Sequence, residues 1–130
     1  MDPSTMHPNA LMMLGAVDAF NRGDSASVGA LFSPDAVWHD HGRGRFSGDK
    51  RGPEIGTWFQ SMTELNCKVD LVDIMADDGH VAFVLRVASD EAGHELDQLH
   101  VNAWRIVEGK VTEGWFLPDD VPAWDAWCAG

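Results

Sequence analysis

Tyrosine is absent from this chain of 130 residues, and cysteine, lysine and arginine are scarce. The two cysteines, Cys67 and Cys128, stand far apart in no metal-binding or redox spacing, so we expect two reduced thiols. Nine Lys and Arg residues face 21 Asp and Glu residues, which gives a formal net charge of −12. A surface this acidic argues against binding to nucleic acid or to anionic membranes.

Long apolar runs are missing as well. No stretch approaches the roughly 20 apolar residues that cross a bilayer, and residues 1–9 lack the basic start and apolar run of a signal peptide. We therefore expect a cytoplasmic protein with a flexible N-terminal tail over residues 1–9 and a single domain over residues 10–130. A chain of this length can bury one hydrophobic core but not two.

Hydrophobic periodicity predicts helices first and strands second. Apolar residues at helical spacing predict three helices, over Asn9–Phe20, over Ser25–Phe32 and from Gly52-Pro53-Glu54 onward. Apolar runs between turn signals predict five strands, over Val37–Asp40, Cys67–Ala76, His80–Ala88, Leu96–Val107 and Lys110–Leu117. Asn9 is the expected N-cap of the first helix. The pattern indicates an α+β fold, in which a curved, mostly antiparallel sheet is wrapped by three N-terminal helices around a conical apolar pocket.

The side chains available to line this pocket are rich in Trp, Phe and Met. A pocket with few polar groups typically binds apolar small molecules, and the absence of Tyr speaks against a sugar. The residues that we expect to contact a substrate are Ala16, Phe20, Trp38, Trp58, Phe59, Trp104 and Phe116.

Asp40 is the first candidate for chemistry. A carboxylate beside Trp38 at a strand end is poorly solvated, which raises its pKa and suits it to general acid–base catalysis. The alternative is that Asp40 starts the turn Gly42-Arg43-Gly44. His39 and His41 share the face opposite Asp40, and no third ligand has a matching spacing, so we expect no metal.

A cluster of cations follows Asp40 in the chain. Four of the nine basic residues fall in one loop: Arg43, Arg45, Lys50 and Arg51. They could receive an anionic group, or they form a solvated loop with balancing charges.

Three segments carry a resemblance to a known family. They are Phe20-Asn21-Arg22-Gly23-Asp24 followed by residues 30–37, the segment Gly48–Phe59, and the segment His100–Val111. Together they resemble the nuclear transport factor 2-like superfamily, specifically its SnoaL-like polyketide cyclase and ketosteroid isomerase branch. The resemblance implies a cone-shaped fold, a homodimer, and a pocket that serves isomerases, dehydratases, cyclases or epoxide hydrolases.

The resemblance also implies roles for individual residues. Asp40 stands where ketosteroid isomerases carry their general base, whereas the Tyr and Asp of their oxyanion hole correspond to Ala16 and Asn102. An amide such as Asn102 can still donate a hydrogen bond. Strand periodicity places His100, Asn102 and Trp104 on one face. The His and Asp of SnoaL-type cyclases correspond to Asn102 and Phe116, and the Asp-Arg-Asp set of epoxide hydrolases has no evident second Asp.

These observations favour a cofactor-independent general acid–base enzyme, an isomerase, dehydratase or cyclase. Its substrate is expected to be an apolar, cyclic or polyketide-like small molecule, with Asp40 as base or acid and with His100 and Asn102 orienting or polarising the substrate. One alternative is a non-catalytic small-molecule-binding or dimerisation module, and another is an epoxide hydrolase-like enzyme. The aromatic tail over residues 115–127 is expected to cap the pocket or to join a dimer contact.

Overall fold

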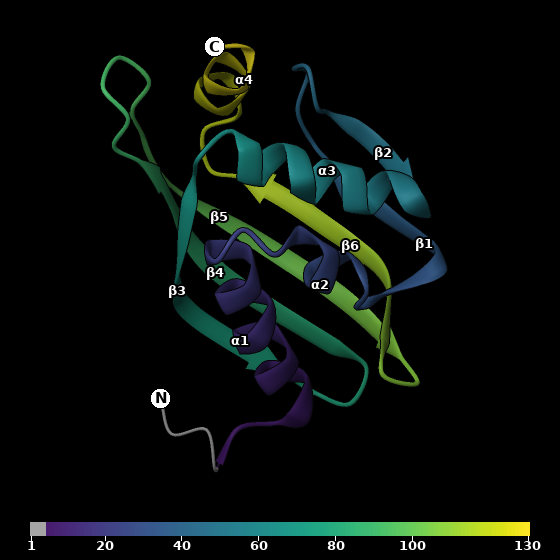
Figure 1. Ribbon diagram of the computed structural model, residues 1–130. Coiled ribbons are helices and arrows are strands. Elements are labelled where there is room, and N and C mark those ends of the chain that lie inside the picture. The colour runs from purple at the N-terminus through teal and green to yellow at the C-terminus, as the bar shows by residue number, and fades with distance from the viewer. Residues whose placement is uncertain (1–4) are drawn as a thin grey trace.

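A computed structural model describes residues 5–130 of the chain. Its sheet has six strands in the order β2-β1-β6-β5-β4-β3, and it is curled without closing into a barrel (Figure 1). The strands are β1 (Phe32–Asp40), β2 (Gly48–Arg51), β3 (Lys68–Ala76), β4 (His80–Ser89), β5 (Leu96–Val107) and β6 (Lys110–Pro118). The helices are α1 (Pro8–Asn21), α2 (Ser25–Gly29), α3 (Pro53–Glu64) and α4 (Val121–Ala129). The predicted α+β fold is confirmed.

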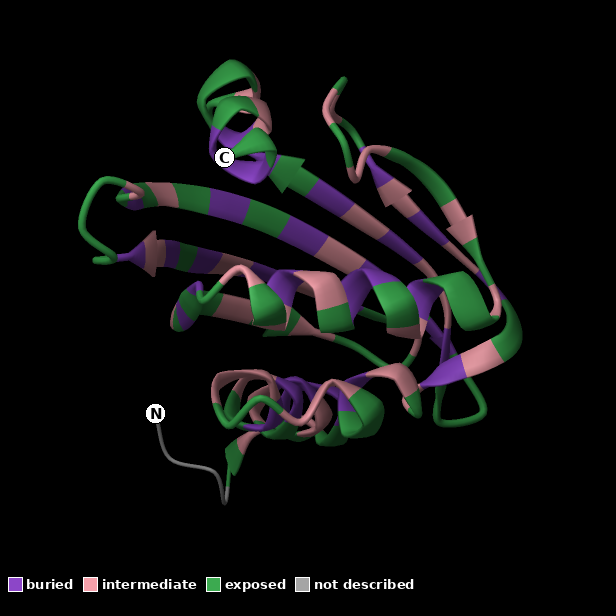
Figure 2. Ribbon diagram, turned by 45° about the horizontal axis from the view of Figure 1, so that its top comes forward, coloured by how far each residue is buried: buried purple, intermediate pink, exposed green. Residues whose placement is uncertain are grey.

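The sheet has two different faces. Buried and exposed positions alternate along the strands in Figure 2, because successive side chains of a strand point to opposite faces. Helices α1 and α3 cover the inner face (Figure 1), and the core lies between them and the sheet. All strand pairs except β1 with β6 are antiparallel, as the sequence predicts for most of the sheet.

Local sequence explains how α3 begins and which side it buries. Pro53 occupies the first turn, where its missing N–H costs nothing. Gly52 precedes it with φ 54°, and a Cβ there would lie 2.9 Å from the carbonyl oxygen of Pro34. The buried residues recur at helical spacing on one stripe: Ile55, Trp58, Phe59 and Met62. Two of them, Trp58 and Phe59, therefore reach the inner face of the sheet.

Hydrogen bonds of Asn21 fasten the end of α1 to the sheet. Its side-chain amide donates to the carbonyl oxygen of Val69 at 2.8 Å and accepts from the Val69 N–H at 3.0 Å. The side chain thereby takes the part of a neighbouring strand at the edge of β3, and it holds α1 over the inner face.

The first two helices differ from prediction at their ends. The N-cap of α1 is His7 rather than Asn9, because Pro8 fits the first helical position and the His7 ring accepts from the Asn9 N–H. The Asn9 side chain donates instead to the carbonyl oxygen of Asp77. Helix α2 stops at Gly29, and Phe32 belongs to β1, since the Leu31 carbonyl already accepts from β6.

The structure contains two elements that were not predicted, strand β2 and helix α4. Residues Gly48–Arg51 lie in the stretch predicted as a loop, yet they pair with β1 as strand β2. The aromatic tail folds as helix α4, whose N-cap is Asp120. Strand β2 is exposed and α4 is apolar on most sides, so neither shows the hydrophobic period that identifies such elements.

The structure describes only part of the predicted N-terminal tail. Residues 1–4 of the predicted tail lie outside the described residues, whereas Pro8 and Asn9 already belong to α1. The division into a tail over residues 1–9 and a domain over residues 10–130 stays a prediction. Over the described range, no helix has the length and apolar character needed to span a membrane.

Candidate active site

Asp40 ends β1 with its side chain turned to the interior, and it is 4% exposed. Its Oδ2 accepts a hydrogen bond from the Trp58 indole N–H at 3.0 Å. Its Oδ1 has no hydrogen-bond partner within residues 5–130. Burial raises the pKa of Asp40 from 3.8 to about 6, although the Trp58 bond and the charge of Lys50 oppose that shift. The pKa of Asp40 thus lies closer to neutrality than that of an ordinary carboxyl, and its side-chain hydrogen bond goes to Trp58 and not to the Gly42-Arg43-Gly44 turn.

His100 is fully buried on β5. Its Nε2–H donates to Gln98 Oε1 at 2.7 Å, which leaves Nδ1 as an unprotonated nitrogen with no described partner. Burial lowers the pKa of His100 to about 4, so the ring is neutral at physiological pH. Its ring packs edge-on against Phe116 and Trp124, each 4.9 Å away between ring centroids.

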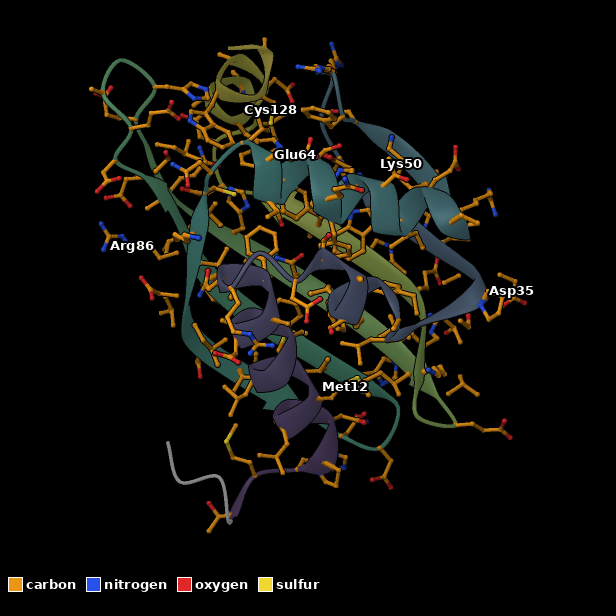
Figure 3. The ribbon with its side chains drawn as sticks, in the orientation of Figure 1. Met12, Asp35, Lys50, Glu64, Arg86 and Cys128 are labelled. Atoms are coloured by element: carbon orange, nitrogen blue, oxygen red, sulfur yellow. The ribbon has the colours of Figure 1, made fainter. Side chains whose placement is uncertain are left out.

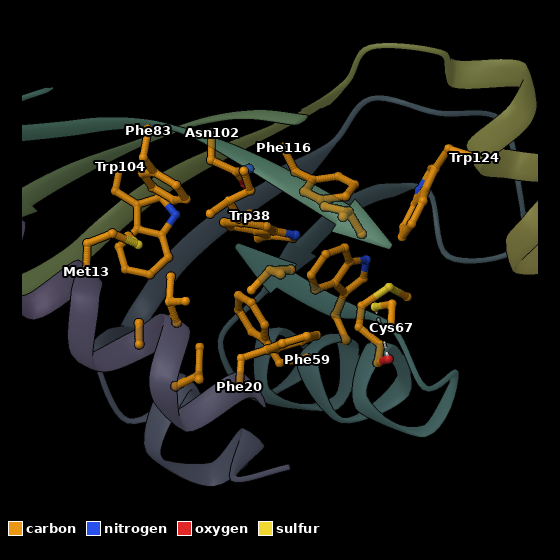
Figure 4. A pocket seen from close by; sticks show the side chains of 18 residues that line it. Met13, Phe20, Trp38, Phe59, Cys67, Phe83, Asn102, Trp104, Phe116 and Trp124 are labelled. Atoms are coloured by element: carbon orange, nitrogen blue, oxygen red, sulfur yellow. Dashed lines mark hydrogen bonds between the residues drawn. The ribbon is translucent and has the colours of Figure 1, made fainter. Parts of the chain in front are cut away.

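An apolar cavity of about 60 Å³ lies between the inner face of the sheet and helices α1 and α3 (Figure 4). Asn102 is the one lining residue with a polar amide, and its Nδ2 has no partner in the described chain. All seven residues predicted to contact a substrate line this cavity: Ala16, Phe20, Trp38, Trp58, Phe59, Trp104 and Phe116. Their contact with a substrate stays a prediction.

Strand register places the candidate residues relative to one another. Asp40 pairs with Phe116 on β6, and Phe116 pairs with Asn102 on β5, so the three lie in one row across the inner face. Asp40 and Asn102 are thus two strands apart, at about 10 Å between Cα atoms, with the Phe116 ring between them. His100 lies two positions from Asn102 on the same face, and the three predicted catalytic residues share no direct hydrogen bond.

Asp40 and His100 stand behind the wall of the cavity. Neither lines it, but each contacts rings that do: Trp58 for Asp40, and Phe116 and Trp124 for His100. Reaching either group from the cavity requires a shift of these rings.

The outer face carries the other candidates. His39 lies there, as predicted, with Nδ1 2.7 Å from Asp49 and Nε2 2.7 Å from Glu113. The His41 ring is 6.2 Å from the His39 ring between centroids. No group of three or more His, Cys, Asp or Glu in residues 5–130 is arranged to hold a metal ion.

The basic loop does not converge on a single point. Lys50 Nζ, in β2, donates to the carbonyl oxygen of Ser47 in the loop before it, and Arg45 stacks on the ring of Phe46. These contacts support the interpretation as a solvated loop. The loop is also fastened to α4, because the Arg43 backbone N–H donates a hydrogen bond to Asp125 Oδ2 at 2.8 Å.

Both cysteines are free and buried, which confirms the prediction of reduced thiols. Burial raises the pKa of each thiol to about 12, so neither is a thiolate at neutral pH. Cys128 lies on α4, at the end of the molecule away from Met12 of α1 (Figure 3).

Contacts of three residues in this region were not predicted from the sequence. Trp58 was predicted only as lining, whereas its N–H also fixes Asp40. Gln98 sets the tautomer of His100, and the i, i+2 spacing of the two residues was the available signal. Trp124, from the aromatic tail, is buried against His100 and lines the cavity.

Comparison with known proteins identifies both the fold and the family of this chain. The chain has a nuclear transport factor 2-like fold, and residues 14–114 match the SnoaL-like domain. The chain therefore belongs to the SnoaL-like family. No match was found among curated protein sequences.

Solved structures support the same assignment. Bal32a, from a soil-derived mobile gene cassette, is 30% identical, with 92% of this chain and 95% of that chain covered and a TM-score of 0.82. A Xanthomonas campestris protein of unknown function with a cystatin-like fold is 29% identical, covering 93% and 98%, with a TM-score of 0.81. SalBIII, an epoxide hydrolase/cyclase-like enzyme in pyran ring formation of the polyether salinomycin, is 15% identical, covering 84% and 88%, with a TM-score of 0.72. The family and its structural neighbours thus include enzymes as well as proteins of unknown function.

Proposed function

We propose that this protein is a cofactor-independent general acid–base enzyme that moves a proton on an apolar cyclic small molecule, with Asp40 as the base or acid. The observation that carries the proposal is the state of the Asp40 carboxyl. It is buried, one oxygen is fixed by Trp58, and the other has no hydrogen-bond partner among residues 5–130 and can take a proton. A pKa of about 6 is well matched to proton transfer near neutral pH.

His100 and Asn102 have supporting roles in this proposal. Asn102 offers an amide N–H to an oxygen of the substrate, which stabilises negative charge that develops there. His100 is neutral and presents an unprotonated Nδ1, so it orients a substrate by accepting a hydrogen bond and does not serve as a cation. Isomerisation, dehydration and cyclisation all use this combination of a base and a polarising donor.

The cavity has to widen before such a substrate fits. Its volume of about 60 Å³ holds a few water molecules, whereas ligand pockets usually measure roughly 300–1,000 Å³. Met13 and Met62 line it, and methionine side chains adapt easily to a new shape. The same widening would shift the rings that separate Asp40 from the cavity.

Proton exchange tests the proposal without knowledge of the natural substrate. β-Tetralone in D2O exchanges its α-hydrogens, and we expect the protein to accelerate this exchange, as followed by proton NMR. Asp40→Asn should lower the acceleration by about 100- to 10,000-fold, the range for loss of a general base. Asp49→Asn is the matched control, because it removes a carboxylate from the outer face.

Two results would point elsewhere. Equal exchange by the wild type and Asp40→Asn would contradict a proton-transfer role for Asp40. Binding of β-tetralone without any exchange would favour the alternative of a small-molecule-binding module.

The proposal extends to a homodimer formed through the outer face of the sheet. Val101 on β5 and Leu117 on β6 are register partners, and both are more than 40% exposed although they are apolar. Sedimentation should show a dimer for the wild type and a monomer for Val101→Lys, whereas a monomeric wild type would contradict this part of the proposal.

A further inference from the structure

Asp40 is buried although it stands at the very end of a strand. The loop over residues 41–47, between β1 and β2, begins directly after it. Figures 1 and 2 show this loop and α4 at the same end of the molecule, with α4 between the loop and the β4–β5 turn. A molecule that reacts at Asp40 therefore has to pass either the rings of the cavity wall or the cover at this end.

Asp125 of α4 fastens the loop to the helix. Its Oδ2 accepts a hydrogen bond from the Arg43 backbone N–H at 2.8 Å. A Cβ at Gly42 would lie 2.5 Å from both Asp125 Oδ1 and Ser47 Oγ, and a Cβ at Gly44 would lie 2.9 Å from Asp125 Oδ1. The two glycines thus make room for the carboxylate, and a side chain at Gly42 would displace it.

The charges around Asp40 place it close to this junction. Burial raises the pKa of Asp40 to about 6, and the charge of Asp125 adds to the shift. Burial likewise raises the pKa of the Cys128 thiol on α4 to about 12, and the charge of Asp40 adds to that shift. Because interactions between charges weaken with distance, both α4 residues lie near the Asp40 carboxyl.

The other side of α4 is held by more bonds. The Trp127 indole N–H donates to the carbonyl oxygen of His94 at 3.1 Å, and His94 Nε2–H donates to the carbonyl oxygen of Trp127 at 2.7 Å. The two rings also stack, 4.7 Å apart between centroids. Among the hydrogen bonds of residues 5–130, only the Arg43 bond joins the loop to α4. Opening at this end is therefore expected to move the loop while α4 stays in place.

We propose that residues 41–47 form a gate over Asp40, and that Asp125 holds this gate closed against α4. The inference rests on the proposed function, because it supplies the route to solvent that a proton-transferring carboxyl requires. A closed gate excludes water during the reaction, and an open gate lets Asp40 exchange its proton with solvent after it. Asp125 acts through the gate and does not touch the reacting atoms, so it is a positioning residue.

Cys128 can report the opening of the gate. It is buried and lies three residues after Asp125, so the two are neighbours on the helix surface. A buried thiol with a raised pKa does not react with N-ethylmaleimide, so its labelling rate measures how often it becomes exposed. Cys67 is the internal reference, because it is also buried and lines the cavity. Peptide mass spectrometry resolves the two sites, and we expect Cys128 to react first.

Variants test the role of Asp125. Asp125→Ala should speed the labelling of Cys128 about tenfold or more, the effect of losing one hydrogen bond to a charged group. Asp125→Asn keeps an acceptor for the Arg43 N–H and should largely restore the wild-type rate. Gly42→Ala puts a methyl group against the carboxylate and should match Asp125→Ala. Asp119→Ala is the matched control, since it removes an exposed acid just before α4.

Two results would overturn the proposal. One is an unchanged labelling rate of Cys128 in both Asp125→Ala and Gly42→Ala. The other is equal labelling of Cys67 and Cys128 in the wild type, because it would mean that the fold opens as a whole. Urea denaturation of each variant shows whether a faster rate comes from lower global stability, which would also contradict a local gate.

The labelling does not depend on catalysis, so this inference and the proposed function can fail separately. If the variants speed the labelling of Cys128 and the wild type exchanges no hydrogens of β-tetralone, the proposed function fails and the gate stands. If exchange occurs and labelling does not respond to Asp125→Ala and Gly42→Ala, the gate fails alone.

Discussion

His39 and Asp40 are neighbours on β1, yet they lie on opposite faces of the sheet and in opposite states. On the outer face, both nitrogens of His39 are hydrogen-bonded, to Asp49 and to Glu113, and Glu113 also accepts from Arg105 at 2.9 Å. On the inner face, Asp40 has one bonded oxygen and one oxygen without a partner in the described part of the chain. The polar atoms of His39 are paired where water could also serve them, whereas Asp40 Oδ1 and His100 Nδ1 have no partner in residues 5–130 although they are buried.

The polar groups of the two faces differ in what they contribute to the stability of the fold. Ion pairs at the surface contribute about 0–1 kcal/mol each, because water competes for them and salt screens them. A buried donor or acceptor without a partner costs about 1–3 kcal/mol. The chain therefore retains its costly groups around the cavity, which is the pattern expected when function opposes stability.

The largest expected effect on stability comes from Asp40→Asn. Because the folded pKa of about 6 exceeds the ordinary 3.8, the folded chain binds a proton more tightly than the unfolded chain does. The ionised carboxylate therefore destabilises the fold by about 3 kcal/mol above pH 6, and the effect disappears below pH 3.8. Urea denaturation should show Asp40→Asn to be more stable than the wild type near pH 7 and equal to it in acid. A gain that is the same at both pH values would contradict this account.

His100 should show the opposite dependence on pH. Its folded pKa of about 4 lies below the ordinary 6.5, so protonation favours unfolding, and stability is lost as the pH falls through this range. The loss amounts to about 3 kcal/mol at the acid end. His100→Leu should remove this acid sensitivity, whereas the control His80→Gln, on the surface, should leave it in place. Thermal melts from neutral pH to about pH 4 measure the difference.

Asn102→Leu should stabilise the fold by about 1–3 kcal/mol, because it removes a buried donor without a partner. Chemical denaturation measures the gain. A loss of stability would show that Asn102 is satisfied inside the protein, and it would remove the reason to assign it a ligand.

The smallest effect is expected on the outer face. The bonds with Glu113 and Asp49 outweigh burial and raise the pKa of His39, but water reaches all three groups. Glu113→Gln should lower stability by at most about 1 kcal/mol, and added salt should reduce the difference further. A cost as large as that predicted for the inner face would break the contrast between the two faces.

Much of the fold follows from the sequence alone. Regular alternation over Leu96–Val107 predicted both the strand and the inward positions of His100, Asn102 and Trp104, because burial of one face imposes a period of two. Strand β2 and helix α4 escaped prediction, since an exposed four-residue strand and a helix that is apolar on most sides have no distinctive period.

The residues that line the cavity were predictable from the sequence, whereas the hydrogen bonds of Asp40 and His100 were less so. Aromatic residues at core positions identified the cavity wall, since large rings in this fold have few other places to pack. The Trp58 bond to Asp40 joins residues 18 apart in sequence, and the Gln98 bond depends on side-chain rotamers. The Trp58 bond leaves no trace in spacing, and the i, i+2 spacing of Gln98 and His100 indicates only that the two side chains share a face. The need for glycine at position 114 was likewise not predictable, because it comes from the Trp38 and Trp104 rings that pack against Gly114 from the neighbouring strands.

The carbon-13 chemical shift of the Asp40 side-chain carboxyl, followed as a function of pH, tests the central claim most directly. Comparison with Asp40→Asn assigns the signal. A buried, half-paired carboxyl behind the wall of the cavity predicts a midpoint near pH 6. A midpoint at or below 3.8 would mean that the group is solvated or fully paired, and it would contradict the role of Asp40 in proton transfer.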